Sequence, residues 1–329
     1  MVVDCIQSWV FFIYLFLIEV EILNKNEVSP LKLVGFFIIN SNMEELVNLN
    51  NQQLQIGELP ELEIVSLDRI VFHEDPDEER SSSLIIYLSK DGRLKNPPMV
   101  AYYEDNAHYI LLDGANRMTA LKKLGIRDVV VQKVDLFDEK LLFLHWHHAV
   151  EKFTKDQFLE KLKTINELSI SQDTSGILDM NNDPDLLCQI QFADMEIYRI
   201  SAECDIFKKV DLLKKITKIY SGFANMDRVS YTNLMHLKTN YPDFCAVVCF
   251  KKFSKKELVQ IVKNNYKLPS GITRIILPKR ALRLNVPLDI LRFEAPVDEK
   301  NHWLQERIKL QVKEKSIRFY YEPTFLFDE

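Results

Sequence analysis

Leu111-Leu-Asp-Gly-Ala-Asn-Arg-Met-Thr-Ala-Leu-Lys-Lys-Leu-Gly125 is the stretch of the chain with the clearest structural signal. Its first residues are apolar and end at Asp113, which indicates a strand, and Gly114 supplies the turn. The apolar residues that follow recur at helical spacing up to Gly125, so we expect a helix that ends at this glycine. The stretch therefore predicts a strand, a tight turn and a helix in succession.

The start of this predicted helix is suited to bind an anion. The N–H groups of a first helical turn have no partner inside the helix, and the helix dipole favours negative charge there. Arg117 adds a fixed charge and a two-pronged donor for phosphate oxygens. The alternative is an ordinary capped helix, with Asp113 as N-cap and Arg117 in solvent. The residues alone leave both interpretations open.

The flanking sequence extends this stretch into a small mixed α/β unit. Strands and helices alternate as β-α-β-β-α-β over about residues 60–135. Further on, we expect helix over 137–168, a basic amphipathic helix over 207–220, and strands at 244–250 and 273–277. The predicted fold class is α/β (α+β), with one domain at 43–136 and a mixed α/β C-terminal domain at 137–329.

The first 42 residues differ from the rest. Their apolar run at 9–18 is ten residues long, whereas a membrane-spanning helix needs about 20. No basic residue precedes the run, as a signal peptide would require. We expect translation to start at Met43, which makes residues 1–42 an upstream apolar extension; a membrane anchor is the alternative.

Glycine is scarce, with 8 in 329 residues. The chain contains no G-x-G-x-x-G, no G-x-S-x-G and no Gly-Lys pair, which excludes a dinucleotide fingerprint, a nucleophile elbow and a P-loop. A phosphate would have to bind at a single helix N-terminus. The net charge of -6 argues against a large nucleic-acid surface. The five cysteines form no C-x-x-C pair, which favours reduced thiols in a cytoplasmic protein. We expect no stable membrane partner.

Three other groups of residues are candidates for chemistry. His73-Glu74 follows the first strand, where a carboxylate near a phosphate can act as a general base; it can also be one more acid of the acidic run 74–79. His145-Trp-His-His148 could bind metal, although Trp146 stacking in a cleft beside a donor histidine suits it better. Thr273 and Arg280 could jointly hold a carboxylate, or lie on a solvated edge strand.

The segment Asp113-Gly-Ala-Asn-Arg117 resembles the D-G-x-H-R signature of the ParB/sulfiredoxin-like superfamily. The likeness covers about 75 residues and includes Leu94-Lys-Asn-Pro-Pro-Met-Val100. Sulfiredoxin chemistry is excluded, because Ala115 stands where those enzymes need a cysteine.

A closer likeness, over about residues 60–295, is to the free L-serine kinases. It rests on the order of several motifs: Trp146-x-His148, Tyr220-Ser-Gly222, Asp227-Arg228, and Leu268-Pro-Ser-Gly-Ile-Thr-Arg274 running through Arg280 to Leu284-Asn-Val-Pro-Leu288. The family includes the kinase of staphyloferrin B siderophore biosynthesis and the archaeal ADP-dependent serine kinases of cysteine synthesis.

The resemblance implies phosphorylation of free L-serine to O-phospho-L-serine, with ATP or ADP as donor and Mg²⁺ as cofactor. It implies Glu74 as general base and Asp113 as a second catalytic residue. The implied nucleotide-binding residues are Gly114, Ala115, Asn116, Arg117 and Thr119. The implied serine-binding residues are Lys95, Trp146, His148, Thr273 and Arg280.

Asn116 departs from the family pattern, because it replaces the usual histidine and cannot carry charge. It motivates one alternative, an inactive ligand-binding relative. A second alternative is a ParB-like nucleotide-binding regulator that contacts DNA, motivated by the lysines of the 207–220 helix. The acidic net charge opposes it, so we expect no nucleic-acid partner.

Overall fold

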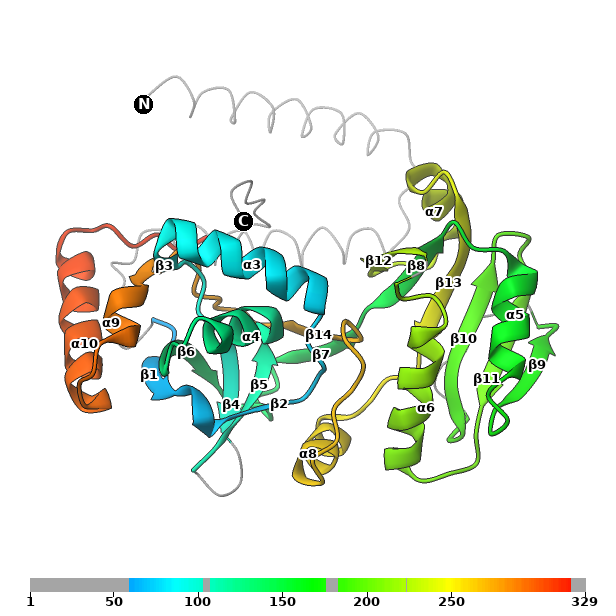
Figure 1. The fold of residues 1–329 in the computed structure, drawn as a ribbon, viewed down its shortest axis with the longest axis horizontal. Coiled ribbons are helices and arrows are strands. Elements are labelled where there is room, and N and C mark those ends of the chain that lie inside the picture. The colour runs from blue at the N-terminus through cyan, green and yellow to red at the C-terminus, as the bar shows by residue number, and fades with distance from the viewer. Residues whose placement is uncertain (1–58, 103–106, 176–182, 223, 321–329) are drawn as a thin grey trace, which may run out of the picture. The chain divides into compact units, whose positions relative to one another are not determined.

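A five-stranded mixed sheet is built from the strands on both sides of Gly114 (Figure 1). The computed structural model describes residues 59–102, 107–175, 183–222 and 224–320, and residues 59–310 form one compact unit. The sheet order is β1-β6-β4-β5-β2, with β2 parallel to β5, β4 parallel to β6, and the other pairs antiparallel. The strands are β1 (Leu62–Ser66), β2 (Ile70–Phe72), β4 (Met99–Tyr102), β5 (Tyr109–Asp113) and β6 (Asp128–Val134).

Two helices complete this part of the fold, α3 (Glu78–Asp91) and α4 (Ala115–Lys123). They pack against each other, as Figure 1 shows. Helix α3 begins after Asp77, whose side chain accepts a hydrogen bond from the Arg80 N–H and caps the helix. A short 3₁₀ turn, η2 (Leu67–Arg69), joins β1 to β2. The predicted β-α-β-β-α-β order is present.

The second sheet has six strands and is antiparallel throughout, in the order β12-β8-β13-β10-β11-β9. Its strands are β8 (His147–Glu151), β9 (Ser169–Asp173), β10 (Leu186–Phe192), β11 (Ile197–Ser201), β12 (Asn225–Val229) and β13 (Phe244–Phe250). The helices near it are α5 (Lys155–Lys163), α6 (Ile206–Lys218), α7 (Leu234–Asn240) and α8 (Lys255–Lys263).

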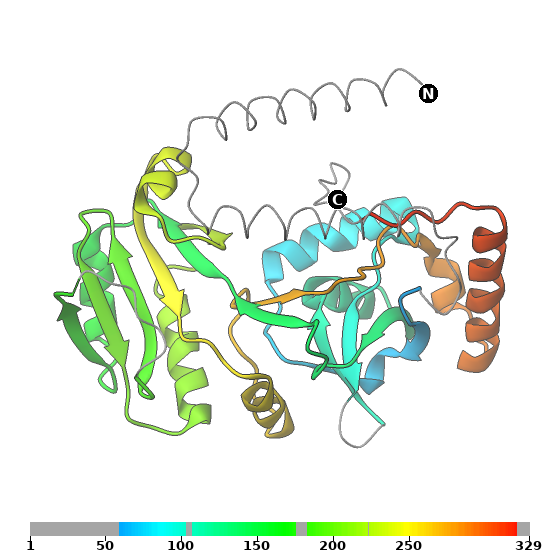
Figure 2. The same cartoon turned by 180° about the vertical axis from the view of Figure 1, so that it is seen from behind.

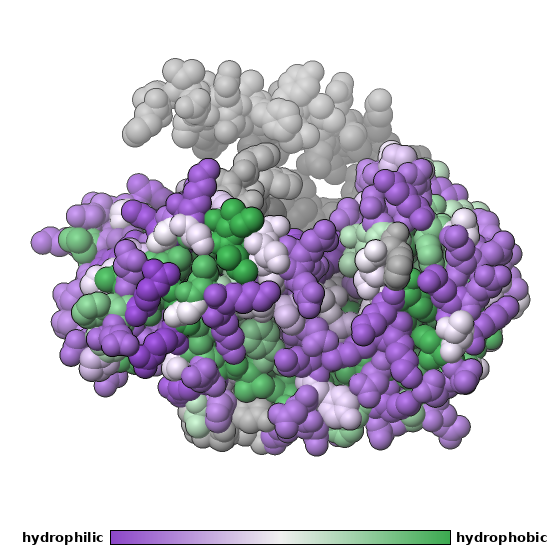
Figure 3. Space-filling model, in the orientation of Figure 1, coloured by the Kyte–Doolittle hydropathy of each residue, from purple (hydrophilic) through white to green (hydrophobic). Residues whose placement is uncertain are grey.

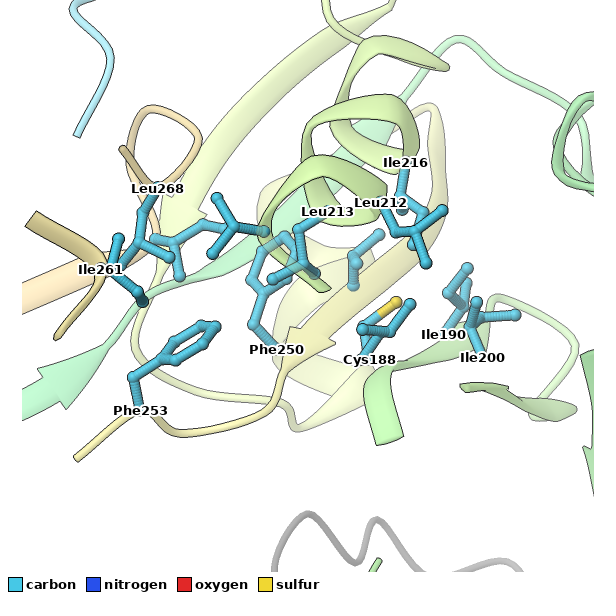
Figure 4. Close-up of a cluster of buried hydrophobic side chains, with 14 of the residues drawn as sticks. Cys188, Ile190, Ile200, Leu212, Leu213, Ile216, Phe250, Phe253, Ile261 and Leu268 are labelled. Carbon is cyan, nitrogen blue, oxygen red and sulfur yellow. The ribbon is translucent and has the colours of Figure 1, made fainter. Parts of the chain in front are cut away.

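The hydrophobic core on one face of this sheet lies against helices α5 and α6, and it continues to α8 and to strands β4 and β5 of the first sheet. Figure 4 shows Leu212, Leu213 and Ile216 of α6 above strand residues such as Cys188 and Ile190. A smaller cluster, which includes Val247 and Leu237, covers the other face of the sheet. Because both faces are covered, β13 is buried along its whole length, which explains its continuous apolar sequence.

The helix predicted over 137–168 is wrong for most of its length. The segment forms β7 (Leu142–His145), β8 and only then α5. Strand β7 pairs with β14 (Thr273–Ile276), as Figure 2 shows, and β8 lies between β12 and β13. The paired residues are 74 to 134 positions apart, so the segment's own pattern could not reveal its partners.

The C-terminal part of the compact unit contacts the first sheet. The Asn301 side chain accepts from the Ile64 N–H at 2.7 Å and donates to the Ile64 carbonyl at 2.8 Å, which satisfies the edge strand β1. Lys300 pairs with Asp128 at 2.5 Å. The remaining elements are β3 (Arg93–Leu94), paired with β15 (Val286–Pro287), and helices α9 (Leu288–Arg292) and α10 (Val297–Lys313). The domain boundary near residue 136 stays a prediction.

Three sequence-based expectations concern the thiols and the N-terminus. Cys188, Cys204, Cys245 and Cys249 are free thiols, as predicted, and burial raises the pKa of each. In the described part of the chain, no helix is both long and apolar enough to cross a bilayer. The expected extension 1–42, and the start at Met43, lie outside the described residues.

Candidate active site

Glu74 follows strand β2 and lies beside the loop that precedes β14. Backbone bonds join the two segments: Leu268 N–H donates to the His73 carbonyl at 2.8 Å, and Asp75 N–H donates to the Leu268 carbonyl at 2.9 Å. Lys214 of α6 also pairs with Asp75 at 2.7 Å. This pairing brings the motif Leu268-Pro-Ser-Gly-Ile-Thr273 next to Glu74, although about 200 residues separate them.

Three donors of that motif hold the Glu74 carboxylate. Oε1 accepts from both the backbone N–H and the hydroxyl of Thr273, each at 2.5 Å, and Oε2 accepts from the Gly271 N–H at 3.1 Å. The Glu74 side chain keeps 12% of its surface exposed. It is therefore fixed in orientation and still reachable, which suits a general base better than it suits one more surface acid.

His73 lies directly behind this contact. Its Nε2 is 2.7 Å from the Thr273 hydroxyl oxygen, and its Nδ1 hydrogen-bonds to the Leu111 carbonyl of β5. The side chain is buried. His73 thus links the end of the first sheet to the hydroxyl that contacts Glu74.

His148 holds the loop from the other side. Its Nε2 donates to the Gly271 carbonyl at 3.0 Å, and its Nδ1 accepts from the Tyr220 hydroxyl at 2.8 Å. Burial lowers the pKa of His148 to about 4, so the ring is neutral near pH 7. Both ring nitrogens are engaged, and the Tyr220-Ser-Gly222 and Trp146-x-His148 motifs meet here.

Arg228 of β12 is a site residue that we did not single out as a candidate. Its guanidinium packs against Gly271 and donates to the Ser270 hydroxyl at 3.2 Å. Burial lowers the Arg228 pKa, while the charges of Glu74 and Asp113 act in the opposite direction. The Asp227-Arg228 motif was the signal that could have identified it.

Asp113 is the centre of a second group of contacts. Its Oδ2 accepts from Arg117 at 2.6 Å and from Arg280 at 2.9 Å. Desolvation alone would raise the pKa of the Asp113 carboxyl, but the two guanidiniums outweigh it and hold that pKa below its usual value. The group presents two arginines at the start of α4, in an orientation fixed by one shared carboxylate.

Gln132 and Asn96 support these arginines. The Gln132 Oε1 accepts from Arg280 at 3.2 Å, and its Nε2 donates to the Lys279 carbonyl at 2.6 Å. The Asn96 carbonyl accepts from Arg117 at 2.7 Å. Gln132 was not among the predicted site residues, although it interrupts an apolar strand, and a buried polar residue in such a strand was the available signal.

Helix α4 starts without a side-chain cap. Gly114 is its N-cap residue, with φ of 99°, and accepts no N–H through a side chain. The alternative with Asp113 as N-cap is therefore wrong, because that carboxylate pairs with Arg117 and Arg280 instead. A Cβ on Gly114 would lie 3.0 Å from Pro98 and 3.3 Å from Arg117, so glycine lets Arg117 lie close to the turn.

The other predicted phosphate ligands sit in the same turn. The Asn116 Oδ1 accepts from the Asp77 N–H at 2.8 Å and thereby joins α4 to the start of α3. The Thr119 hydroxyl donates to the Ala115 carbonyl at 2.9 Å, within the helix. The side-chain oxygen of Asn116 therefore has a structural role in holding the two helices together.

Two predicted serine ligands, Lys95 and Trp146, contact other side chains of the protein. Lys95 contacts the hydroxyl and ring of Tyr87 on α3. The Arg274 guanidinium stacks on the Trp146 ring, 4.4 Å from its centroid, and the Trp146 backbone N–H donates to the Ile272 carbonyl at 2.8 Å. Trp146 therefore contacts, through its backbone, the loop that binds Glu74, whereas Lys95 contacts α3.

The structure also bears on the metal and DNA alternatives. The three neighbouring histidines lie on β7 and β8, not on a helix, and no group of three metal-ligating side chains occurs among the described residues. The α6 lysines are largely paired: Lys208 and Lys215 with Glu167, Lys209 with Asp185, and Lys214 with Asp75. Figure 3 shows hydrophilic side chains over much of α6.

A fixed carboxylate and an uncapped helix start with two arginines are the elements that phosphoryl transfer to a hydroxyl requires. The comparisons with known proteins agree: the chain is a distant homologue of the free L-serine kinases over most of its length. No family model matches the chain.

The relatives are named as kinases of free serine. The ATP-dependent L-serine kinase SbnI of Staphylococcus aureus is 23% identical over 82% of this chain and 97% of its own length. An ATP-dependent L-serine kinase of Staphylothermus marinus is 25% identical over 70% of this chain and 90% of its own length.

Solved structures show the same fold. C-terminally truncated SbnI from Staphylococcus aureus has a TM-score of 0.60 and 22% identity, over 76% of this chain and 96% of that chain. A free serine kinase variant in complex with ADP has a TM-score of 0.61 and 18% identity, over 71% and 95%. The mixed α/β fold with several sheets is therefore shared with serine kinases.

Proposed function

We propose that this protein phosphorylates free L-serine to O-phospho-L-serine, with ATP or ADP as the phosphoryl donor. The observation that carries the proposal is the Glu74 carboxylate, held by the Thr273 and Gly271 donors. The relatives named as L-serine kinases, and solved neighbours in complex with AMP and ADP, support it. The product would supply cysteine or siderophore synthesis.

Glu74 would take the proton of the serine hydroxyl as the oxygen attacks the terminal phosphorus. The backbone N–H groups at the start of α4, from Gly114 to Arg117, would bind the donor phosphates, with Thr119 in the same turn. Arg117 and Arg280 would add charge-assisted hydrogen bonds to phosphate or to the serine carboxylate. Asp113 would then act through the orientation of both guanidiniums.

Magnesium commonly takes one or two carboxylates together with phosphate oxygens and water. Asp113 suits such a site, because one of its oxygens holds both arginines and the side chain is 44% exposed. Bound there, Mg²⁺ would neutralise charge on the transferred phosphoryl group.

The serine-binding roles divide into two kinds. Lys95, Trp146 and Arg280 would contact the amino acid itself. His148 and Thr273 have their polar atoms committed to Gly271, Tyr220, His73 and Glu74, so they would act by positioning. We also assign residues 43–136 to a ParB/sulfiredoxin-like nucleotide-binding domain and 137–329 to the domain that completes the serine site.

The decisive experiment is incubation of the protein with L-serine, Mg²⁺ and either ATP or ADP, with detection of O-phosphoserine by mass spectrometry. We expect product with at least one donor. Absence of product with both donors, together with nucleotide binding by calorimetry, would identify an inactive ligand-binding relative instead.

A further inference from the structure

The contacts of Thr273 with His73 and Glu74 determine how many hydrogen atoms these three side chains must share. The Thr273 hydroxyl oxygen lies 2.5 Å from Glu74 Oε1 and 2.7 Å from His73 Nε2, and each contact needs one hydrogen. Threonine supplies one hydrogen only. His73 Nδ1 must keep its own hydrogen, because its partner is the Leu111 carbonyl, which can only accept.

A neutral imidazole with an ionised carboxylate therefore leaves the network one hydrogen short. Two arrangements satisfy both contacts. In one, Glu74 Oε1–H donates to the Thr273 oxygen, whose own hydrogen bonds His73 Nε2. In the other, His73 Nε2–H donates to the Thr273 oxygen, whose hydrogen bonds the Glu74 carboxylate. Both hold one added proton, and they differ only in which end carries it.

We propose that Glu74, Thr273 and His73 form a proton relay, in which the proton removed from the acceptor hydroxyl passes through Thr273 to His73 Nε2. This inference rests on the proposed kinase function and assigns it a second proton-holding group. Glu74 touches the reacting hydroxyl, whereas His73 acts through Thr273.

The transfer balances. As the serine oxygen bonds phosphorus and the donor's bridging oxygen leaves with its electron pair, the hydroxyl proton moves to Glu74. Glu74 Oε1 then gives this proton to the Thr273 oxygen, which gives its own to His73 Nε2. The imidazolium and the carboxylate remain 3.9 Å apart, where they attract each other. After product release, the same path returns the proton through Glu74 to water.

The surroundings favour storage of a proton at this position. His73 is buried, so water does not replace Thr273 as its partner. The charged groups near the relay are Glu74 itself, Arg228 beside Glu74, and Asp75, which Lys214 neutralises. Before proton uptake, one of the two contacts of the Thr273 hydroxyl lacks a hydrogen; after it, both are hydrogen bonds. The site is therefore complementary to the state in which the acceptor hydroxyl has lost its proton.

Single-turnover formation of O-phosphoserine, measured in mixtures of H₂O and D₂O, tests the relay. For the wild-type protein we expect a rate that curves with deuterium fraction, because two protons move. Thr273→Val keeps the shape and the backbone N–H but removes the bridging hydroxyl. His73→Gln can still bond Thr273 but cannot take a proton. We expect each to lower the single-turnover rate at least about 10-fold, with a linear deuterium dependence and unchanged nucleotide affinity.

Thr239→Val and His236→Gln, both at exposed positions of α7, are the matched controls and should leave the rate unchanged. Wild-type activity of His73→Gln, or a linear deuterium dependence of the wild type, would overturn the relay while leaving the kinase function in place. A wild type that forms no O-phosphoserine would instead remove the kinase proposal.

Discussion

Arg228 packs so closely against Gly271 that a Cβ on the glycine would lie 2.1 Å from the arginine Nε. The same glycine donates its N–H to Glu74 and accepts from His148 through its carbonyl. Its φ is +78°, in the region that favours glycine. One residue without a side chain therefore sets the distance between the carboxylate, the imidazole and the guanidinium.

We predict that Gly271→Ala lowers kcat by at least about 10-fold, because the methyl group must displace Arg228 and the N–H that orients Glu74. Steady-state kinetics of O-phosphoserine formation measures the effect. Gly125→Ala is the matched control: its φ is +68°, but a Cβ there meets nothing within 4 Å. It should cost about 1 kcal/mol of stability through backbone strain and leave kcat unchanged. Equal effects of both substitutions would refute the role of the Arg228 contact.

Glu74→Gln should lower turnover at least about 100-fold, the usual contribution of a positioned base. The amide is isosteric and retains an oxygen for the Thr273 N–H, so nucleotide affinity by calorimetry should not change. Glu79→Gln, on the exposed start of α3, removes an equal charge and should have no effect on turnover. Unchanged turnover of Glu74→Gln would mean that another group is the base.

Asn116→Asp should separate stability from nucleotide binding. An aspartate keeps the oxygen that accepts from the Asp77 N–H, and a negative charge in a first helical turn is favourable, so stability should change by less than about 1 kcal/mol. The same charge would repel a phosphate at that turn. We expect the nucleotide Kd to rise at least about 10-fold, with Asn240→Asp on α7 as an inert control. An unchanged Kd would place the phosphates elsewhere.

Acid should destabilise the protein through buried histidines. Burial lowers the pKa of His148 and of His145 from 6.5 to about 4. As the pH falls below 6.5, these histidines bind protons in the unfolded chain but not in the folded protein. The free energy of unfolding therefore decreases until about pH 4. At pH 5 the loss is about 2 kcal/mol for each histidine.

Urea denaturation at pH 7.5 and pH 5 measures this difference. In His148→Gln the decrease should shrink by the contribution of one histidine, whatever the variant's stability at pH 7.5. The exposed His236→Gln should retain the full wild-type decrease. A pH dependence that is identical in His148→Gln would show that His148 is not the group responsible.

Much of the fold around Gly114 followed from local pattern. The apolar strand up to Asp113 and the helix that ends near Gly125 depend on residues within a few positions of one another. The helix predicted over 137–168 failed because β7 and β8 owe their conformation to partners in β12, β13 and β14. The pattern within a segment does not identify the distant strand that pairs with it.

The sequence alone was enough to exclude a glycine-rich phosphate loop, to predict an anion site at the start of α4 and to indicate the resemblance to the serine kinases. It also named Glu74, Asp113 and Thr273, but as separate residues. The tertiary structure decided how they meet: Thr273 contacts Glu74 and His73, Asp113 joins Arg117 to Arg280, and Arg228 packs on Gly271. Hydrogen bonds act over about 3 Å, so only the folded chain, which brings residues 200 positions apart to that distance, can determine which groups share a proton or a charge.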